Sequence, residues 1–365
     1  MRQGMSISEF TSEINRQAQS KRDFIAPAAK MSIEPNPSKG ASPDGYTMKW
    51  RLSLGGDSAF PMRKLAHQQI AERIQVPWQY YERMAEDDSE LLSRDVNHWL
   101  HKSDDVRMVR TLDGQARAVL GQTYRPMDNF DLVKAITPTI VKGQESLGLR
   151  IESMNLTETR LYMKIFSTRI TGNVKVGDTI QAGVLIQNSE VGFSNISVTP
   201  MSLRLVCLNG ATHDDLAMKR RHVGRRDNAP DGVEEYLSDR SKYLDDAAFW
   251  SKITDAVSAA FDDLRFKTRI EKMQAALDDR IPPKAKIEGV QEIVQKTYNL
   301  TQSEGDQFLR NLIEGADLSR YGVAQAITAI ANSDEVSYDR AGDLERLGGR
   351  VLELPQTEWK ALVAA

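Results

Sequence analysis

The sequence predicts an α+β fold, with a mostly antiparallel β-sheet, a helical hairpin before it and a helical C-terminal region. Between residues 147 and 208, apolar and polar residues alternate with a period of two, which is the pattern of half-buried strands. Asp113-Gly114 separates two strand-like runs, as in a tight hairpin. From residue 233 onward, apolar residues recur at helical spacing. Because strands precede helices in the chain, we expect the helices to pack on one face of the sheet or to form a separate lobe.

The composition is that of an ordinary globular protein. The chain has 365 residues, of which 40% are hydrophobic and 27% charged, and its net charge is -3. This balance excludes a polycation, so any contact with nucleic acid must come from a local basic surface. There is no run of about 18 apolar residues that would span a membrane, and the N-terminal residues lack the apolar core of a signal peptide. We therefore expect a soluble, cytoplasmic protein with no membrane partner.

Residues 1–45 are predicted to form an N-terminal arm and a flexible linker. Ile7, Phe10 and Ile14 follow helical spacing, but their segment is otherwise polar. Residues 35–45 are rich in Pro, Gly and Ser, which is typical of a connector. Because so short an apolar stripe cannot hold a helix by itself, we expect the arm to pack on another subunit of a homo-oligomer or to remain mobile. Deletion of the arm should then leave the body folded.

An α+β body is predicted for residues 46–232. It begins with a strand at 48–54, where apolar and polar side chains alternate. Helical spacing over residues 62–86, which restarts at Pro77, predicts a helical hairpin. The runs on either side of Asp113-Gly114 should pair as an antiparallel hairpin, because these two residues can take the positive φ angles of a type I′ turn.

A helix and four strands complete the predicted body. The helix should begin near residue 129, with Asp128 or Asn129 as its N-cap. The strands are expected at 147–154, 159–167, 179–187 and 194–208. Because Cys207 shares its parity with Leu203 and Leu205 in the last strand, we expect its thiol to be buried.

Residues 233–365 are predicted to be helical. Apolar residues within 249–273 trace one long helix. Thr301 and Glu304 have the spacing of a capping box at the start of the next helix. Two further helices should follow, the last of them ended by Gly348-Gly349. They are expected at 321–332 and 338–347.

Four stretches of the chain together resemble one protein family. They are "IAERIQVPWQYYERMAE", "LLSRDVNHWL", "RAVLGQTYRPMDNFDLVKAI" and "VGFSNISVTPMSLRLVCLNGAT". In this order they resemble the DUF932 family, whose members are carried by phages and plasmids. The helical part from residue 240 onward resembles the family more loosely. The resemblance implies occurrence on mobile elements, and it brings no reaction and no catalytic residues with it.

No set of residues predicts a catalytic, metal or cofactor site. The chain lacks the common phosphate loop, the dinucleotide fingerprint and the nucleophile elbow. His98 and His101, one turn after Asp95, could ligate a metal, but a partly buried helix end explains them better. His213 and the two aspartates that follow it would suit a metal-dependent nuclease, but a solvated loop is the simpler interpretation. The sequence therefore favours a binding protein over an enzyme.

A basic cluster after the predicted sheet is the first candidate for a binding site. It comprises Lys219, Arg220, Arg221, Arg225 and Arg226. Such a cluster binds phosphates by releasing their counterions, with no dependence on base sequence. The alternative is a solvated loop whose cations pair with acidic neighbours at 214–215 and 234–235.

One predicted strand carries cations and aromatic rings alternately on a single face. The residues of this face are Arg160, Tyr162, Lys164 and Phe166, and Arg204 on a later strand adds a further cation. Interleaved rings and cations suit the bases and phosphates of a single strand. The alternative is that the C-terminal helices cover this face.

These observations lead to one functional hypothesis and two alternatives. We expect a mobile-element protein that binds single-stranded or recombining DNA without base specificity, in DNA recombination or annealing. The first alternative is a non-catalytic protein that self-assembles or contacts a host factor and has no role with nucleic acid. The second alternative is a metal-dependent nuclease.

Overall fold

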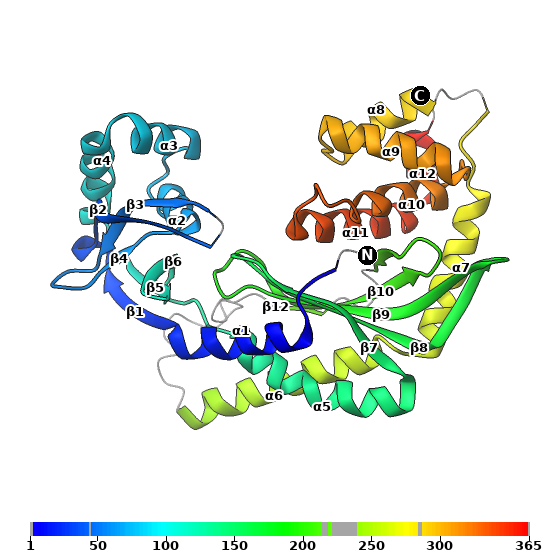
Figure 1. The fold of residues 1–365 in the computed structure, drawn as a ribbon, viewed down its shortest axis with the longest axis horizontal. Helices are drawn as coiled ribbons and strands as arrows, with labels where there is room; N and C mark the ends of the chain where they lie inside the picture. Colours follow the sequence, from blue (N-terminus) through cyan, green and yellow to red (C-terminus); the bar gives the residue numbers. More distant parts are fainter. Residues whose placement is uncertain (1–2, 44, 214–217, 221–238, 284–286, 364–365) are drawn as a thin grey trace.

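The structure is a computed structural model that describes residues 3–43, 45–213, 218–220, 239–283 and 287–363. Figure 1 shows a central antiparallel sheet with helices above and below it and a smaller N-terminal lobe at its left-hand end. The predicted α+β class is confirmed. Within the described residues, no helix is both long enough and apolar enough to cross a membrane.

The N-terminal lobe combines two three-stranded sheets with a group of helices. One sheet has the order β1-β5-β6 and the other the order β2-β3-β4. Its elements are β1 (Arg22–Pro27), η1 (Ala28–Lys30), β2 (Ser32–Ala41), β3 (Thr47–Ser53), β4 (Ala59–Pro61), α2 (Lys64–Arg73), α3 (Trp78–Asp87), α4 (Ser89–His101), β5 (Val106–Leu112) and β6 (Gln115–Gly121). Both sheets and the helices share one apolar core, which contains Trp50, Leu92 and Val109.

Several predicted elements of this lobe are confirmed. The strand at 48–54 is β3, and the helical hairpin is the pair α2 and α3. The turn between β5 and β6 has φ angles of 54° at Asp113 and 71° at Gly114, as a type I′ hairpin requires. A local turn therefore sets the pairing of these two strands.

The central sheet has the strand order β11-β10-β9-β8-β7, and β12 pairs with the start of β10. Its strands are β7 (Leu149–Leu156), β8 (Leu161–Lys175), β9 (Asp178–Asn188), β10 (Ile196–Arg204), β11 (Asn209–Thr212) and β12 (Met218–Arg220). Helices cover both faces, so the middle strands are buried almost throughout. The expectation that the helices pack on one face only, or stand apart, is therefore wrong.

The helices that cover the sheet come from three parts of the chain. Their bounds are α1 (Ile7–Ser20), α5 (Asn129–Leu147), α6 (Asp239–Ala259), α7 (Asp263–Asp278), α8 (Ile287–Thr297), α9 (Gln302–Gly315), α10 (Arg320–Ile330), α11 (Tyr338–Leu352) and α12 (Gln356–Leu362). In Figure 1, α5 and α6 lie below the sheet, and α10 and α11 lie above it. The capping box of Thr301 and Glu304 is present at the start of α9.

The N-terminal helix does not form the predicted arm. Ser6 and Glu9 form a capping box, and α1 packs on α5 and β7 of the same chain. Phe10 and Ile14 are buried in the main core of the protein. The prediction was wrong because the short stripe of α1 meets an apolar surface within its own chain, which a sequence pattern cannot reveal.

The predicted linker is also wrong for residues 35–41, which belong to strand β2. This strand pairs with β3, and the register shifts between Pro35 and Gly40. An irregularity of this kind lets a strand contain prolines, whose nitrogen cannot donate to a ladder. The composition that indicated a connector therefore belongs to an edge strand.

The predicted strand at 194–208 ends early, and Cys207 is exposed rather than buried. Residues 205–208 form a turn between β10 and β11, in which Leu208 has a φ of 51°. Leu205 and Val206 are exposed as well. The parity argument failed because this turn is built from apolar residues and contains none of the usual turn formers.

Two helix ends differ from the prediction. The single long helix at 249–273 is two helices, because the Asp262 side chain accepts a hydrogen bond from the Arg265 backbone and starts α7. Conversely, α11 continues through Gly348-Gly349. A Cβ at Gly348 would lie 2.2 Å from the Thr328 side chain, so this glycine permits the close approach of α11 to α10.

We predict that Phe10→Ala lowers the free energy of unfolding by about 3 kcal/mol, because a buried aromatic ring leaves a cavity when it is removed. Urea denaturation followed by circular dichroism measures the change. Ile7→Ala is the matched control, since Ile7 lies on the same helix but is exposed. Equal stability of the wild type and Phe10→Ala would restore the interpretation of α1 as a detachable arm.

We also predict that His67 makes the protein less stable in acid. His67 is completely buried, with Nδ1 2.8 Å from the Tyr81 hydroxyl, and burial lowers its pKa from 6.5 to about 3. Between these values the unfolded chain binds a proton that the folded chain does not, so stability falls as the pH decreases through this window. His67→Gln should flatten the dependence of unfolding free energy on pH, whereas His101→Gln, at an exposed position, should keep it. An unchanged slope in His67→Gln would contradict this assignment.

Candidate functional site

The strand face that the sequence favoured for nucleic acid is covered. Tyr162, Lys164 and Phe166 on β8 are all buried beneath the C-terminal helices. The Lys164 Nζ donates to Glu345 Oε1 of α11 over 2.6 Å. The Tyr162 hydroxyl donates to Asp339 over 2.7 Å. These three side chains are not available to a ligand in this structure, and the alternative, coverage by the C-terminal helices, is the arrangement observed.

The other two predicted cations of the sheet have different surroundings. Arg204 donates from Nε to Asp178 over 2.6 Å, and the Tyr321 hydroxyl donates to the same carboxylate. Arg204 is therefore part of the packing between the sheet and α10. Arg160 lies at the other end of the sheet, with its guanidinium 4.7 Å from the ring centroid of Phe193. Half of the Phe193 side chain is exposed, so this pair reaches solvent.

The basic cluster is only partly described. Lys219 is exposed on β12, where it pairs with Ser197 of β10. The backbone of Arg220 also belongs to β12. The Arg220 side chain and three further arginines of the cluster, Arg221, Arg225 and Arg226, lie outside the residues that the structure describes.

The sheet nevertheless brings Lys219 and Arg160 to the same end of one face. Lys219 pairs with Ser197, Ser197 with Gln187, and Gln187 with Tyr162 in successive strands. Side chains directly opposite one another lie on the same face. Arg346 of α11 donates to Gln187 over 3.1 Å, and Arg160 donates to the Tyr162 hydroxyl over 3.0 Å. We call Arg160, Phe193, Lys219 and Arg346 the sheet-end surface.

A cleft of about 380 Å³ lies beside this surface, between α1, the β5–β6 hairpin and the turn from β7 to β8. Its charged lining residues are Arg16, Arg63, Arg117, Arg160, Glu13, Asp113, Glu158 and Glu190. Cations and carboxylates are equal in number here, and most of them form ion pairs with one another. The cleft therefore offers little net charge to an anionic ligand.

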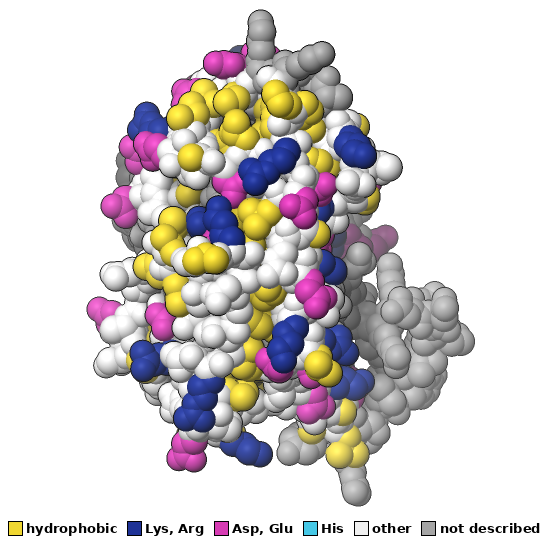
Figure 2. Space-filling model, turned by 90° about the vertical axis from the view of Figure 1, so that its right-hand side faces the viewer, with side chains coloured by type: hydrophobic (Ala, Val, Ile, Leu, Met, Phe, Trp, Pro, Cys, Tyr) yellow, Lys and Arg dark blue, Asp and Glu magenta, His cyan; other side chains and the backbone are white. Residues whose placement is uncertain are grey.

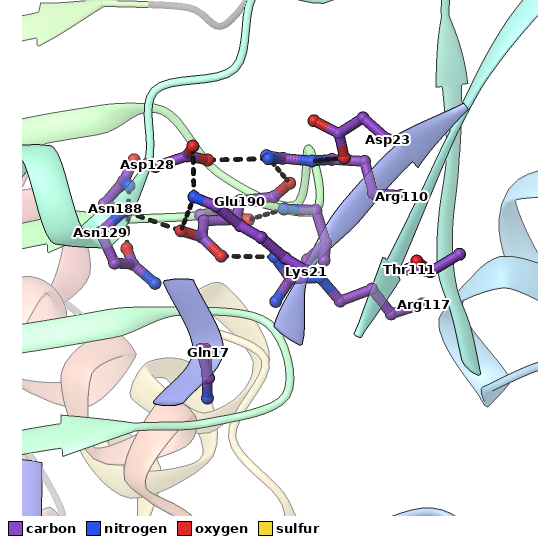
Figure 3. A network of polar contacts seen from close by, with 12 residues as sticks. Gln17, Lys21, Asp23, Arg110, Thr111, Arg117, Asp128, Asn129, Asn188 and Glu190 are labelled. Atoms are coloured by element: carbon purple, nitrogen blue, oxygen red, sulfur yellow. Dashed lines mark hydrogen bonds and ion pairs between the residues drawn. The ribbon is translucent and has the colours of Figure 1, made fainter. Parts of the chain in front are cut away.

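Figure 3 shows the polar network beside the cleft, which joins the N-terminal lobe to the sheet. Arg110 of β5 donates to Asp23, to Asp128 and to the backbone carbonyl of Glu190 over 2.7–2.9 Å. The Glu190 carboxylate contacts Arg117 and accepts from the Asn129 backbone. All these contacts link parts of the same chain, so the network is primarily structural.

Asp128 precedes α5, as predicted, but its side chain does not cap the helix. Its carboxylate contacts Arg110 and Lys21 instead. Burial alone would raise the pKa of Asp128, but the two cations lower it below its usual value. The sequence contained no signal for this network, because its members come from segments widely separated along the chain.

The histidines considered as metal ligands are not grouped. His213 is buried, with Nε2 2.8 Å from the Ser202 hydroxyl, and the two aspartates after it lie outside the described residues. His98 and His101 lie exposed on α4. Within the part of the chain that the structure describes, no three His, Cys, Asp or Glu side chains are arranged to hold a metal ion.

Charge is mixed on the right-hand face of the molecule. Figure 2 shows lysine and arginine side chains interspersed there with aspartate, glutamate and apolar groups. Among the described residues of that face there is no continuous basic surface. This face therefore offers no extended anion-binding surface among the described residues.

We predict that Lys164→Met lowers the free energy of unfolding by about 3–5 kcal/mol, because it leaves the Glu345 carboxylate buried without its partner. The double variant Lys164→Met/Glu345→Leu should be close to the wild type, since it removes both charges. Urea denaturation of the single and double variants measures the difference. A loss below about 1 kcal/mol in the single variant would show that the pair is accessible to water.

The model of one protein family matches this chain. The family is described as Domain of unknown function (DUF932), and the match covers residues 116–328, more than half of the chain. No curated protein matches the chain, and no solved structure does. The match begins in β6, includes the whole central sheet and ends in α10. It thus starts and ends later than the four stretches that carry the resemblance in the sequence. The chain therefore belongs to the DUF932 family.

Proposed function

We propose that the protein binds single-stranded nucleic acid, and single-stranded DNA in particular, without base specificity. The observation that supports this proposal is the sheet-end surface, where Arg160 packs against the half-exposed ring of Phe193, and Lys219 and Arg346 lie at the same end of the sheet. These residues come from different elements, yet the strand pairing and α11 bring them to one end of the sheet. The chain that follows β12 carries Arg221, Arg225 and Arg226 within six residues of it.

The charges of the sheet-end surface favour an anionic ligand. Asp343 lies 3.1 Å from Arg346 and 4.0 Å from Arg160, so these two arginines share one carboxylate. Cations in this arrangement bind phosphates through counterion release, which gives affinity without base specificity.

Phe193 adds a reason to expect an unpaired strand rather than a duplex. Bases stack on aromatic side chains only when they are not paired and stacked with one another. The Arg160 guanidinium packs against the ring, and half of the side chain remains exposed. A base could therefore stack on Phe193 while Arg160, which packs against the same ring, contacts a phosphate.

The wider role also stays a proposal. The resemblance to a family carried by phages and plasmids implies a mobile element, and we propose DNA recombination or annealing as the process in which the protein binds single strands. A cytoplasmic homo-oligomer is part of the same proposal. Neither catalysis nor a cofactor is part of it.

One observation favours a second candidate function, as a protein that self-assembles or contacts another protein. Leu205, Val206 and Leu208 are exposed in the turn between β10 and β11. Consecutive exposed apolar residues are typical of protein interaction sites. If the protein has no affinity for nucleic acid, this turn is the next place to test.

We predict that Lys219→Ala/Arg346→Ala weakens binding of an oligothymidine strand and flattens the slope of log K against log salt by about 0.7 for each lost phosphate contact. Phe193→Ala should weaken binding by about 1–3 kcal/mol, with a smaller effect on the slope. Fluorescence anisotropy over a series of salt concentrations measures both quantities. The same titration applied to Arg221→Ala/Arg225→Ala/Arg226→Ala tests the basic cluster.

Arg83→Ala is the matched control, because Arg83 is an exposed arginine on α3 of the N-terminal lobe. It should change neither the affinity nor the slope. Thermal stability should change little in Arg83→Ala, since exposed ion pairs contribute little to folding. Unchanged affinity and slope in both multiple variants would refute the proposed function.

A further inference from the structure

A second basic region lies on the N-terminal lobe, separate from the sheet-end surface. It is a pocket of about 640 Å³ between the ends of α2 and α4 and the start of β5. Arg73, Lys102 and Arg107 line it together with Trp99. Among the described residues no acidic side chain lines this pocket, whereas the cleft beside the sheet-end surface has as many carboxylates as cations.

Trp99 is 48% exposed, although it is one of the largest apolar side chains. Its neighbours Val96 and Leu100 on α4 are buried, so they, and not the indole, attach this helix to the core. The Lys102 Nζ lies 5.6 Å from the centre of the indole. Almost half of Trp99 is therefore exposed to solvent, with a cation over its ring and the His98 ring against it edge to face.

Cations are common at helix C-termini, and Arg73 and Lys102 both stand at such positions. The terminal carbonyls, however, accept hydrogen bonds from the backbone. Ile74 donates to Ile70, and Val76 donates to Ala71 in a turn where Gln75 has a φ of 60°. Partial charges of about one half at each helix end offset only part of three full charges.

The third cation, Arg107, is in a strand and has no helix end to stabilise. Burial lowers its pKa, and the nearby Arg73 lowers it further, against the opposing effect of Asp105. Arg73 and Arg107 line the same pocket, where their like charges repel each other. Arg107 pairs with Asp105, whereas neither Arg73 nor Lys102 has a carboxylate within 4.0 Å among the described residues. A bound anion would relieve this repulsion.

We propose that this pocket binds a nucleotide, with its phosphate on the three cations and its base stacked on Trp99. The volume lies in the range of about 300–1,000 Å³ that is usual for small-molecule sites. An exposed indole beside cations matches the combination of a planar base and a phosphate. The nucleotide can be a free mononucleotide or one unit of a strand, and only the latter source rests on the proposed function.

The test measures binding of adenosine 5′-monophosphate by isothermal titration calorimetry, with adenosine and inorganic phosphate as partial ligands. An oligothymidine strand is measured in parallel. Trp99→Ala should weaken binding of the monophosphate or of the strand roughly five- to a hundredfold, as expected for the loss of one stacked base. Arg73→Ala/Lys102→Ala should weaken binding of the same ligand and reduce its salt dependence.

The controls are Tyr80→Ala and Arg83→Ala, an exposed aromatic and an exposed arginine on α3. Neither should change binding. Trp99→Phe keeps an aromatic face and should retain most of the affinity, which separates stacking from any effect on folding. Circular dichroism of each variant checks that the lobe remains folded.

The outcomes distinguish this site from the proposed function. Monophosphate binding that depends on Trp99 supports the pocket even if no strand binds. Strand binding that depends on Trp99, without monophosphate binding, also supports it and identifies the strand as the source. The inference is overturned if inorganic phosphate binds with the same affinity as the monophosphate and Trp99→Ala has no effect. It is also overturned if binding of neither the monophosphate nor the strand depends on Trp99. Strand binding that depends on Lys219 and Phe193 alone would leave the proposed function standing without the pocket.

Discussion

The guanidinium of Arg110 is the group on which the arrangement of the two halves of the protein depends. Arg110 is completely buried, and it donates hydrogen bonds to groups from β1, from the start of α5 and from the end of β9. A buried charge costs several kcal/mol unless partners surround it, so the N-terminal lobe and the sheet satisfy each other's charges only in this orientation. Lys21 and Arg117 extend the same network (Figure 3). The lobe is thus positioned by directional polar contacts together with a small apolar cluster, in which Val191 packs against Met108, Ala118 and Leu120 of β5 and β6.

The cost of burying a charge without partners also determines which basic residues can contact a ligand. Lys164 is a cation that could attract phosphate, but it is buried in an ion pair with Glu345. It therefore holds α11 on the sheet and is not available to a ligand. Arg204 is committed in the same way to Asp178. What remains for an anion are cations without a close carboxylate of their own, or with one shared among several. Among the described residues, Arg73 and Lys102 near Trp99 are cations of the first kind, and Arg160 and Arg346, which share Asp343, are cations of the second kind.

These two surfaces differ in their relation to the family. Arg160, Phe193 and Lys219 lie within the residues that the DUF932 model matches, whereas Arg73, Trp99 and Arg107 precede them. The sheet-end surface is therefore built mainly by the part of the chain that the family model describes. The pocket belongs to the N-terminal lobe, which joins that part through the Arg110 network. If both surfaces bind the same strand, the Arg110 network also fixes the distance that the strand must span between them.

The sequence by itself determined the elements whose causes are local. The type I′ turn at Asp113-Gly114 and the capping box of Thr301 and Glu304 depend on a few adjacent residues, and the structure has both. Alternation likewise located the strands of the central sheet, because a sheet that buries its side chains needs apolar residues at regular positions. The α+β class followed from the order of these elements.

Only the tertiary structure decided which residues are available to a ligand. Lys164 and Glu345 are 181 residues apart, so no local pattern shows that they neutralise each other. Phe10 is buried for a similar reason, since α5 and β7 supply the surface that its own segment lacks. The helix end that contains His98 and His101 was predicted to be partly buried, and the exposure of Trp99 within it became evident only once the ends of α2 and α4 met β5. Burial and charge balance are properties of side chains brought together from distant segments, and a sequence pattern records only near neighbours.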